Sequence, residues 1–353
     1  MNRNPRYTSN SKNVKKRRKN KSFARKRIAV LTLLVLCVGL VVFLGWQVAH
    51  NISRAIATGD QPDPQLSKTT EPPATTTTHP TISVSATLAS PRILVYDATH
   101  SAVLYSQNPD EKCYPASLTK LLTAIIATEE CTPDEIFTVG SEQSFVNANS
   151  SRAYIYKGYK LTRDMIIDAL LLPSGNDAAY TIAAHVGRKL LNNPEASDIE
   201  ALFAFADKMN EKAKEFGAVN SHFSNPDGYF AEDHYTTASD MLKIALAAMK
   251  YDNIRQSVAK KSVTYTLPSG QNITFRNTNL LINPNSNYYF EGATGLKTGS
   301  TDESGYCVVA TAQRDGVEIV AVVMGGPTDG DRWKDTIAVL NQAFAIHQTQ
   351  PAN

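Results

Sequence analysis

The chain has 353 residues, 42% of them hydrophobic and 20% charged, an ordinary globular composition that is long enough for two domains or one large one. Its formal net charge of +3 conceals a split, because residues 1–27 contain twelve Lys or Arg and no acidic residue. The remainder has 24 basic residues against 33 acidic ones. It is therefore acidic, and no nucleic-acid partner is expected.

The basic tail at residues 1–27 is followed by an uncharged apolar run at residues 28–46. A helix of that length spans about 28 Å, close to the hydrocarbon thickness of a bilayer. The positive-inside rule places the tail in the cytoplasm and everything after the run outside. We therefore expect an N-terminal transmembrane helix that anchors the chain in the cell membrane as a single-pass protein. The alternative is a cleaved signal peptide with an A-x-A site at residues 55–57, but the run exceeds the usual signal length.

Residues 47–90 have the composition of a linker. They are rich in Pro and Thr and hold few large apolar residues, so little burial would offset the entropy of ordering them. A flexible chain of this length spans roughly 35–40 Å on average. The segment is therefore predicted to tether an extracytoplasmic domain above the membrane.

From residue 91 the pattern is that of a folded domain, which we expect to extend to residue 348. Strand patterns occur at residues 92–96, 102–105, 263–267, 272–276, 295–299, 305–313 and 317–324. Helical spacing of apolar residues occurs at residues 117–130, 162–171, 177–191, 199–216, 237–250 and 328–346. Strands at both ends with helices between them predict an α+β fold, a sheet domain that carries an inserted helical subdomain.

The cysteines and histidines form no recognisable metal motif. The chain has no C-x-x-C, H-x-x-H or H-x-H spacing, so neither a metal nor a cofactor is expected and a zinc enzyme is disfavoured. Three cysteines follow the apolar run, Cys113, Cys131 and Cys307. A helix between the first two would separate them by roughly 20 Å, so we expect free thiols and not a disulfide framework.

Three short motifs stand in order along the predicted domain: S-x-x-K at residues 117–120, S-x-N at 174–176 and K-T-G at 297–299. Together they match the signature of serine β-lactamases and penicillin-binding proteins. Each motif is weak alone, since a second S-x-x-K occurs at residues 257–260 and a second S-x-N at 11–13. We interpret these two as a helix surface and part of the cytoplasmic tail.

Local context distinguishes the first motif. Pro115 and Ala116 precede Ser117 and an apolar helix follows, so Ser117 is predicted at a helix start, where free backbone N–H groups and the helix dipole favour developing negative charge. Lys120 lies three residues on and therefore on the same helix face. The alternative interpretation of this segment is an N-cap serine with a surface lysine.

The other two motifs also have simple structural alternatives. Ser174 and Asn176 lie between two predicted helices, where a turn followed by an N-cap is an alternative explanation. Lys297 lies in a strand pattern, and a solvated lysine on an edge strand is the alternative there. All three alternatives must hold at once to defeat the functional interpretation.

Longer segments extend the resemblance. Residues 115–123 (PASLTKLLT), 171–179 (LLPSGNDAA), 225–228 (NPDG) and 234–237 (HYTT) resemble the low-molecular-mass penicillin-binding D-alanyl-D-alanine carboxypeptidases, serine peptidase family S11. The likeness covers residues 91–346. It implies a serine β-lactamase/DD-peptidase-like fold, with an antiparallel sheet flanked by helices. Gly175 replaces the Asp of S-D-N, which favours a carboxypeptidase over a β-lactamase.

The resemblance also implies a mechanism. Ser117 would attack the peptide carbonyl of a terminal D-Ala-D-Ala and form an acyl-enzyme. Lys120 would take the serine proton, which requires its pKa to be lowered by desolvation and by a second cation, for which Lys297 is the candidate. Ser174 would relay the proton towards the leaving amine. The expected function is removal of the terminal D-alanine from peptidoglycan stem pentapeptides, with β-lactam antibiotics as inhibitors.

The same resemblance implies how substrate is bound. Asn176 would hydrogen-bond the substrate backbone, and the backbone N–H groups of Ser117 and Ser300 would form the oxyanion hole. The strand around Thr298 would pair with the extended substrate, and its hydroxyl would meet the terminal carboxylate. Arg332 is a further candidate for that carboxylate, although a surface arginine is the alternative.

Three competing functions stay open. A β-lactamase would need a carboxylate to activate the deacylating water, and Asp227 and Glu232 lie in a suitable region. A DD-endopeptidase that cuts cross-links would carry the same motifs. The third is a catalytically inactive penicillin-binding or wall-binding protein, against which the intact motifs argue.

Overall fold

The computed structural model describes residues 81–84 and 87–348. The predicted cytoplasmic tail, the predicted anchor and most of the predicted linker lie outside these residues. The described end of the predicted linker is wrong as a linker, because Ile82 and Ser90 are buried and the N–H of Ile82 donates to the carbonyl of Leu104, so the domain begins before residue 91. None of the helices within them has both the length and the apolar character needed to cross a bilayer.

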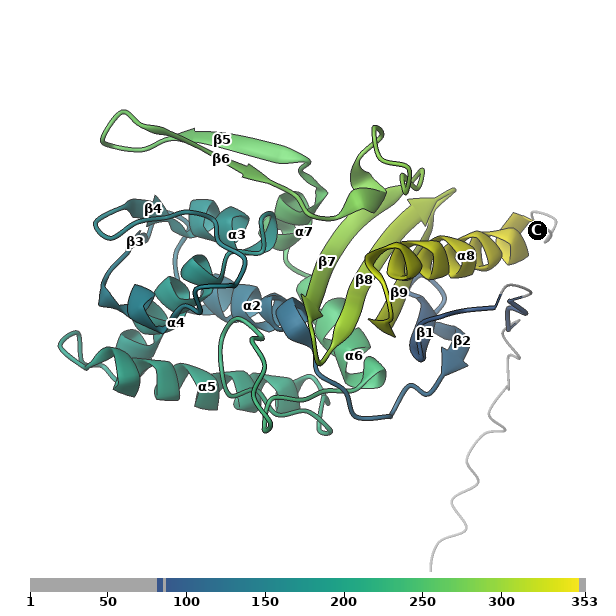
Figure 1. Cartoon of the computed structure of the whole chain (residues 1–353), viewed down its shortest axis with the longest axis horizontal. Helices are drawn as coiled ribbons and strands as arrows, with labels where there is room; N and C mark the ends of the chain where they lie inside the picture. Colours follow the sequence, from purple (N-terminus) through teal and green to yellow (C-terminus); the bar gives the residue numbers. More distant parts are fainter. Residues whose placement is uncertain (1–80, 85–86, 349–353) are drawn as a thin grey trace, which may run out of the picture. The chain divides into compact units, whose positions relative to one another are not determined.

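A five-stranded antiparallel sheet forms the centre of the described domain (Figure 1). Its strand order is β2-β1-β9-β8-β7, so the first two strands of the domain join the last three. Arg92 of β1 pairs with Met324 of β9, 232 positions further along the chain. The strands are β1 (Arg92–Asp97), β2 (Ala102–Gln107), β7 (Ala293–Thr301), β8 (Gly305–Arg314) and β9 (Val317–Gly326).

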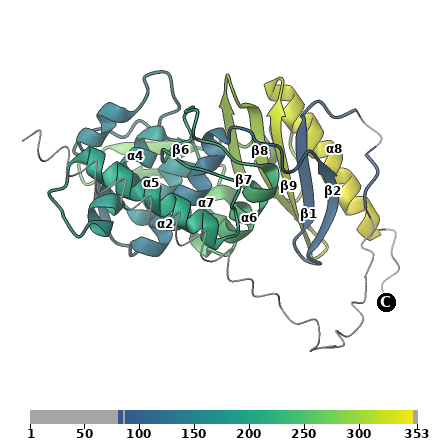
Figure 2. The same ribbon diagram turned by 90° about the horizontal axis from the view of Figure 1, so that it is seen from below.

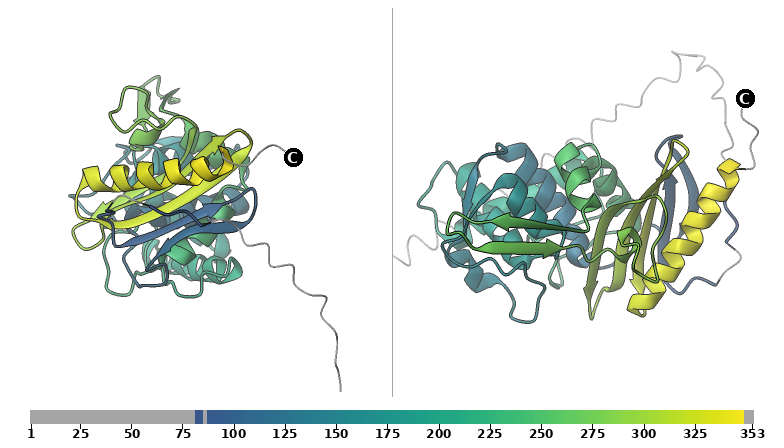
Figure 3. Two further views of the ribbon diagram at one scale, coloured as in Figure 1. Left: turned by 90° about the vertical axis from the view of Figure 1, so that its right-hand side faces the viewer. Right: turned by 90° about the horizontal axis from the view of Figure 1, so that it is seen from above.

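Helices cover both faces of this sheet. One face carries the helical region inserted between β2 and β7, and the other carries the C-terminal helix α8 (Asp329–Gln348), as Figures 2 and 3 show. The inserted region contains the 3-10 helices η1 (Ala116–Thr119) and η2 (Ser141–Phe145) and the helices α2 (Lys120–Glu130), α3 (Arg163–Leu171), α4 (Asn176–Leu190), α5 (Asp198–Glu215), α6 (Ala238–Ala248) and α7 (Asp252–Ala259). The predicted arrangement of an antiparallel sheet flanked by helices, with an inserted helical subdomain, is confirmed.

Two apolar cores result from this layering. Along β8, Val309 packs towards the helical region, whereas Val308 and Ala310 pack towards α8 together with Trp333 and Phe344. Successive strand residues point to opposite faces, so a strand that is covered on both sides is apolar throughout. The sheet is therefore held between two packed layers, and β7 at its edge has a fixed position.

Short elements account for most differences from the predicted ones. The two-stranded ribbon β3 (Ile136–Thr138) and β4 (Lys160–Thr162) was not predicted, because three residues are too few to show a period. Helix α7 was not predicted as an element, and it places Ser257 in the interior and not on a helix surface. The predicted strands at 263–267 and 272–276 exist as β5 (Ser262–Thr266) and β6 (Asn272–Arg276), which form a separate ribbon. A short 3-10 helix, η3 (Leu280–Ile282), precedes β7.

Candidate active site

Ser117 lies in the first turn of a helix, as predicted. The 3-10 turn η1 leads directly into α2, and the Nζ of Lys120 donates a hydrogen bond of 2.7 Å to the Oγ of Ser117. Ala116, immediately before the serine, has φ +48°, a left-handed conformation that is costly for a residue with a Cβ. The chain therefore stores strain at the residue that presents Ser117.

The Lys120 ammonium is completely buried and uses three acceptors. Besides Ser117, its Nζ donates to the Oδ1 of Asn176 and to the backbone carbonyl of Asp227, each at 2.7 Å. An ammonium has three donors, so the group is saturated and fixed in place. The alternative of a surface lysine after an N-cap serine is therefore wrong for this segment.

Burial is the main cause of the lowered pKa values of the two lysines at this site. It lowers the pKa of Lys120 to about 8, against the opposing charges of Asp227 and Asp177. The pKa of Lys297 lies well below its ordinary value, first through burial and then through repulsion from Lys120 and Arg332. Desolvation, which was predicted as one cause, is the first cause of the lowered pKa in both amines. The repulsion between Lys120 and Lys297, the second predicted cause, is mutual and belongs to the pair.

Ser174 connects the second motif to the third. The Nζ of Lys297 donates to the Oγ of Ser174 at 2.9 Å and to the carbonyl of Thr298 at 2.9 Å. Ser174 has φ +61° in the tight connection between α3 and α4, a second strained residue at the site. Lys297 is buried, so it is not a solvated lysine on an edge strand.

Gly175 explains why this motif is S-G-N. A Cβ at this position would lie 2.6 Å from the carbonyl oxygen of Ala169 and 2.7 Å from the Oδ1 of Asp177. The aspartate of an S-D-N motif therefore has no room here without movement of the backbone.

Asp177, which sequence reasoning did not single out, holds the adjoining loop. Its buried carboxylate accepts backbone N–H bonds from Ala153, Ile155 and Ala178 at 2.8–3.1 Å. Burial raises the pKa of this carboxyl, and the three backbone donors act in the opposite direction. The aspartate thereby fixes the segment that follows Ser151, whose carbonyl accepts the N–H of Asn176.

Strand β7 passes directly beside the nucleophile. A Cβ on Gly299 would lie 2.9 Å from the backbone nitrogen of Ser117, so only glycine allows this approach. Ser300 follows on the same strand and lines the cavity next to Ser117. The two backbone amides predicted to form the oxyanion hole, those of Ser117 and Ser300, therefore belong to adjoining walls of one site.

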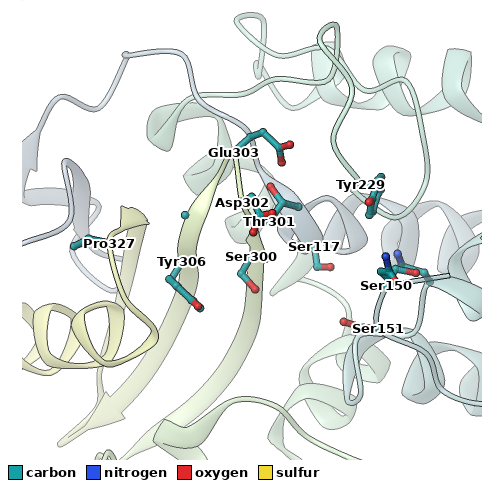
Figure 4. A pocket seen from close by; sticks show the side chains of 14 residues that line it. Ser117, Ser150, Ser151, Tyr229, Ser300, Thr301, Asp302, Glu303, Tyr306 and Pro327 are labelled. Atoms are coloured by element: carbon teal, nitrogen blue, oxygen red, sulfur yellow. The ribbon is translucent and has the colours of Figure 1, made fainter. Parts of the chain in front are cut away.

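These walls enclose a cavity of about 610 Å³, within the range of small-molecule sites. Figure 4 shows Ser117 between Ser300 on β7 and the loop that carries Ser151, with Tyr229 above. The lining residues are Ser117, Asn149, Ser150, Ser151, Asn176, Gly228, Tyr229, Ser300, Thr301, Asp302, Glu303, Gly305, Tyr306 and Pro327. The opening is therefore polar, and none of these described lining residues is basic.

Thr298 and Arg332, which were expected to bind the substrate carboxylate, make other contacts in the structure. The Thr298 hydroxyl is hydrogen-bonded to that of Thr278 at 2.8 Å. Arg332 is buried rather than at the surface, and it donates to the carbonyls of Gly299 and Cys307 at 3.1 and 3.2 Å and pairs with Asp329. Arg332 is thus absent from the described cavity lining, and the structure gives it a role in supporting β7.

The two carboxylates considered for deacylation do not line the cavity. The Asp227 side chain is buried beside Lys120, and Glu232 is exposed on the surface. Asp302 and Glu303, in the turn between β7 and β8, are the acidic side chains among the described lining residues. No motif marked them or Tyr229, because loop residues enter the site only through the folding of distant segments.

The second S-x-x-K has a different structure. The Ser257 hydroxyl and the Lys260 ammonium both donate to Asp168, to its two separate oxygens, at 2.6 Å each. In the second motif a carboxylate therefore lies between the serine and the lysine, whereas in the first motif the serine and the lysine are in direct contact. Ser257 and Lys260 serve to fix α7 against α3.

Comparison with known proteins agrees with this geometry. The family model of D-alanyl-D-alanine carboxypeptidases, peptidase family S11, matches residues 74–328, and the chain belongs to this family. The chain is 32% identical over 283 residues to a D-alanyl-D-alanine carboxypeptidase of Streptomyces sp. (strain K15), covering 78% of this chain and 91% of the relative. It is 30% identical over 252 residues to D-alanyl-D-alanine carboxypeptidase DacF of Bacillus subtilis (strain 168), covering 70% of this chain and 60% of the relative.

Other relatives carry related names. A D-alanyl-D-alanine endopeptidase of Pseudomonas aeruginosa is 32% identical over 241 residues, covering 67% of this chain and 71% of the relative. The crystal structure of the Streptomyces K15 DD-transpeptidase superposes with a TM-score of 0.67 at 30% identity, covering 74% of this chain and 98% of that one. The fold is therefore the DD-peptidase fold.

Proposed function

We propose that the chain is a serine-type D-Ala-D-Ala carboxypeptidase that removes the terminal D-alanine from peptidoglycan stem pentapeptides and is inhibited by penicillin. Membership of the S11 family supports this proposal. The observation that carries it is the contact between the buried amine of Lys120 and the hydroxyl of Ser117. A lysine whose pKa is lowered by burial is a base that can activate a serine near neutral pH.

In the acylation step, neutral Lys120 takes the hydroxyl proton while the Oγ of Ser117 attacks the penultimate D-Ala carbonyl. The backbone amides of Ser117 and Ser300 stabilise the resulting oxyanion. As the C–N bond breaks, the proton that Lys120 took from Ser117 passes through Ser174 to the amine of the departing D-alanine, which leaves Lys120 neutral for the next step. The hydrogen bond from Lys297 to Ser174 supports this route, because it fixes the hydroxyl that relays the proton.

In the deacylation step, a water molecule attacks the Ser117 ester. A base accepts one water proton, and the Ser117 oxygen regains a proton as the ester bond breaks, which releases the shortened peptide acid. Lys120 is the base already in contact with the serine, and no second group is required for the proton balance. The enzyme returns to its starting state.

The edge position of β7 supports the proposed mode of substrate binding. β7 is the last strand of the sheet and pairs within it only with β8, so its outer side is available to an extended peptide. Asn176 and Ser300 line the cavity beside Ser117 and are placed to contact the peptide. The Thr298 hydroxyl would meet the terminal carboxylate after exchanging its bond to Thr278.

The same geometry discriminates among the competing functions. A β-lactamase is disfavoured because Gly175 leaves no room for the S-D-N aspartate and because neither Asp227 nor Glu232 lines the cavity. The intact contact between Ser117 and Lys120 disfavours an inactive binding protein. A DD-endopeptidase is the second candidate, favoured by the endopeptidase among the relatives.

We further propose that residues 28–46 form a single-pass anchor with residues 1–27 in the cytoplasm and the enzyme domain, residues 91–348, outside. The charge asymmetry and the length of the apolar run support this topology. N-terminal sequencing of the mature protein tests it. Retention predicts the original N-terminus, and a mature chain that begins near residue 58 would refute the anchor without refuting export.

The activity is tested by incubating the full-length chain with a stem pentapeptide that ends in D-Ala-D-Ala and measuring released D-alanine. A cross-linked peptide dimer, assayed in parallel, measures endopeptidase cleavage. The proposal predicts D-alanine release that is abolished in Ser117→Ala and exceeds cleavage of the dimer. Preferential cleavage of the dimer would favour the endopeptidase, and inactivity on both substrates would favour a binding protein.

A further inference from the structure

Three potential metal ligands converge at the opposite end of the sheet from the active site. They are Asp97 at the end of β1, His100 in the turn that follows, and His347 in the last turn of α8. Their ligand atoms all lie within 4.8 Å of one another. Figure 2 shows the end of α8 beside β1 and β2, so residues some 250 positions apart meet here.

The Asp97 carboxylate is held with one oxygen directed at the two imidazoles. Its Oδ1 accepts the backbone N–H groups of Thr99 and His100, each at 2.9 Å. Its Oδ2 lies 2.8 Å from the Nδ1 of His100 and 2.9 Å from the Nε2 of His347. Backbone donors of this kind orient a carboxylate as a metal ligand and leave the second oxygen for the metal.

The Nε2 of His347 is not satisfied by this arrangement. Although it lies 2.9 Å from the Asp97 oxygen, the alignment is not that of a hydrogen bond, and within the described part of the chain this buried atom has no hydrogen-bond partner. The rings of His100 and His347 stack with centroids 5.2 Å apart and planes at 16°. The nitrogen therefore has the Asp97 carboxylate as a charged neighbour but no hydrogen bond, and a cation bound beside the carboxylate would give its lone pair a partner.

We propose that Asp97, His100 and His347 bind a zinc-class divalent cation, with water completing the coordination. Two imidazoles and one carboxylate suit zinc and its neighbours in the transition series, whereas magnesium and calcium prefer oxygen ligands alone. Zinc holds such ligands at about 2.0–2.2 Å, and the three donor atoms are already close enough to share one ion after small side-chain movements.

The position of the site assigns it a structural role. Asp97 pairs with Ile319, which lies on the same row of the sheet as Ala312 and Ala293. Ala293 precedes Ser300 by seven residues on β7, which corresponds to roughly 24 Å along the strand. The bound ion would fasten the last turn of α8 to the turn between β1 and β2, and it would not take part in the chemistry at Ser117.

The test uses the full-length chain without a histidine tag, freed of metal by a chelator and titrated with zinc sulfate in a calorimeter. We expect one zinc equivalent per chain and a higher unfolding temperature with zinc. His347→Gln should weaken binding at least about tenfold, since even second-shell changes at zinc sites cost about 10–100-fold. His222→Gln is the matched control, because His222 also lies near an aspartate, Asp233, but outside this cluster.

His185→Gln is titrated as well, because Cys131, Glu135 and His185 form a second cluster with metal-ligating side chains. Undiminished zinc binding in His347→Gln, or its loss in His185→Gln alone, would overturn the proposal, as would the absence of zinc binding by the parent chain. Acylation by penicillin checks that each variant is folded. A measurement on the parent chain removes any dependence on variants: zinc should protect His100, but not His222, from modification by diethyl pyrocarbonate, and equal modification with and without zinc would also overturn it.

Discussion

The Nζ of Lys120 and the Oγ of Ser117 are in direct contact at 2.7 Å, whereas the same S-x-x-K spacing at Ser257 and Lys260 gives two groups that both bind Asp168. The difference lies in helix position. Ser117 and Lys120 occupy the first turns of η1 and α2. There the side chain of Asn176 and a backbone carbonyl accept the other two hydrogen bonds of the Lys120 ammonium. Ser257 and Lys260 lie at the C-terminal end of α7, facing a carboxylate.

Lys120→Ala should lower the rate of acylation by penicillin by about 10²–10⁴-fold, the usual loss when a proton-transfer group is removed. Acylation of the full-length chain by a fluorescent penicillin, followed over time, gives this rate. Lys260→Ala is the matched control from the second S-x-x-K and should be acylated at the parent's rate. Equal rates in Lys120→Ala and the parent would show that Lys120 is not the base.

Acylation should increase with pH through about 8, because Lys120 accepts a proton only when neutral and its pKa is about 8. The ionised form of Asp227 raises that pKa, while burial raises the pKa of Asp227 itself, so Asp227→Asn should shift the midpoint of the profile to lower pH. Glu232→Gln, a change at an exposed carboxylate nearby, should leave the midpoint in place. A profile that is unchanged in Asp227→Asn would show that Asp227 carries no charge in the free enzyme.

His234 should make folding sensitive to acid. It is buried, its Nδ1 accepts the N–H of Ser224 and its Nε2 lies 2.9 Å from the Thr119 hydroxyl, and burial lowers its pKa from 6.5 to about 3. The unfolded chain therefore binds a proton that the folded chain does not, so the contribution is complete above pH 6.5 and is lost as the pH falls towards 3. Stability should decrease by up to about 1.4 kcal/mol per pH unit below pH 6 from this group.

Urea unfolding at pH 7, 6 and 5 measures this effect. The decrease in unfolding free energy between pH 6 and 5 should be smaller in His234→Gln than in the parent by about 1 kcal/mol. His222→Gln, a change at an exposed histidine, should retain the parent's pH dependence. Identical dependence in His234→Gln and the parent would show that His234 is protonated in the folded chain.

The penicilloyl ester on Ser117 should persist, while the peptide ester is hydrolysed rapidly. The bound drug retains its leaving group beside the ester and obstructs water, whereas D-alanine diffuses away. The rates of release of the two acyl groups are compared on one preparation. If penicillin is hydrolysed as fast as D-alanine is released, the β-lactamase interpretation is correct, and Asp302 and Glu303, which line the cavity, become the carboxylates to mutate.

The long elements of the fold could be predicted from the sequence because their apolar residues recur with the period of a helix or a strand. The final strands and α8 agree with prediction to within a few residues. Helix α7 was not predicted, because eight residues show little more than two turns of periodicity and Ser257 is buried by a polar contact with Asp168.

The site could be predicted only in part. The motifs identified Ser117, Lys120, Ser174 and Lys297, which the structure places in two hydrogen-bonded pairs. The backbone bonds to Asp177 and the orientation of Arg332 behind β7 depend on segments far apart in the chain, and no local pattern encodes them.

Mass spectrometry of the full-length chain after incubation with penicillin tests the central claim most directly, since it identifies the nucleophile. Digestion of the labelled protein should yield one adduct, on the peptide that contains Ser117. The adduct should be lost in Ser117→Ala and retained in Ser257→Ala, the matched change in the second S-x-x-K. An adduct on Ser257, or no adduct on the folded protein, would contradict the account.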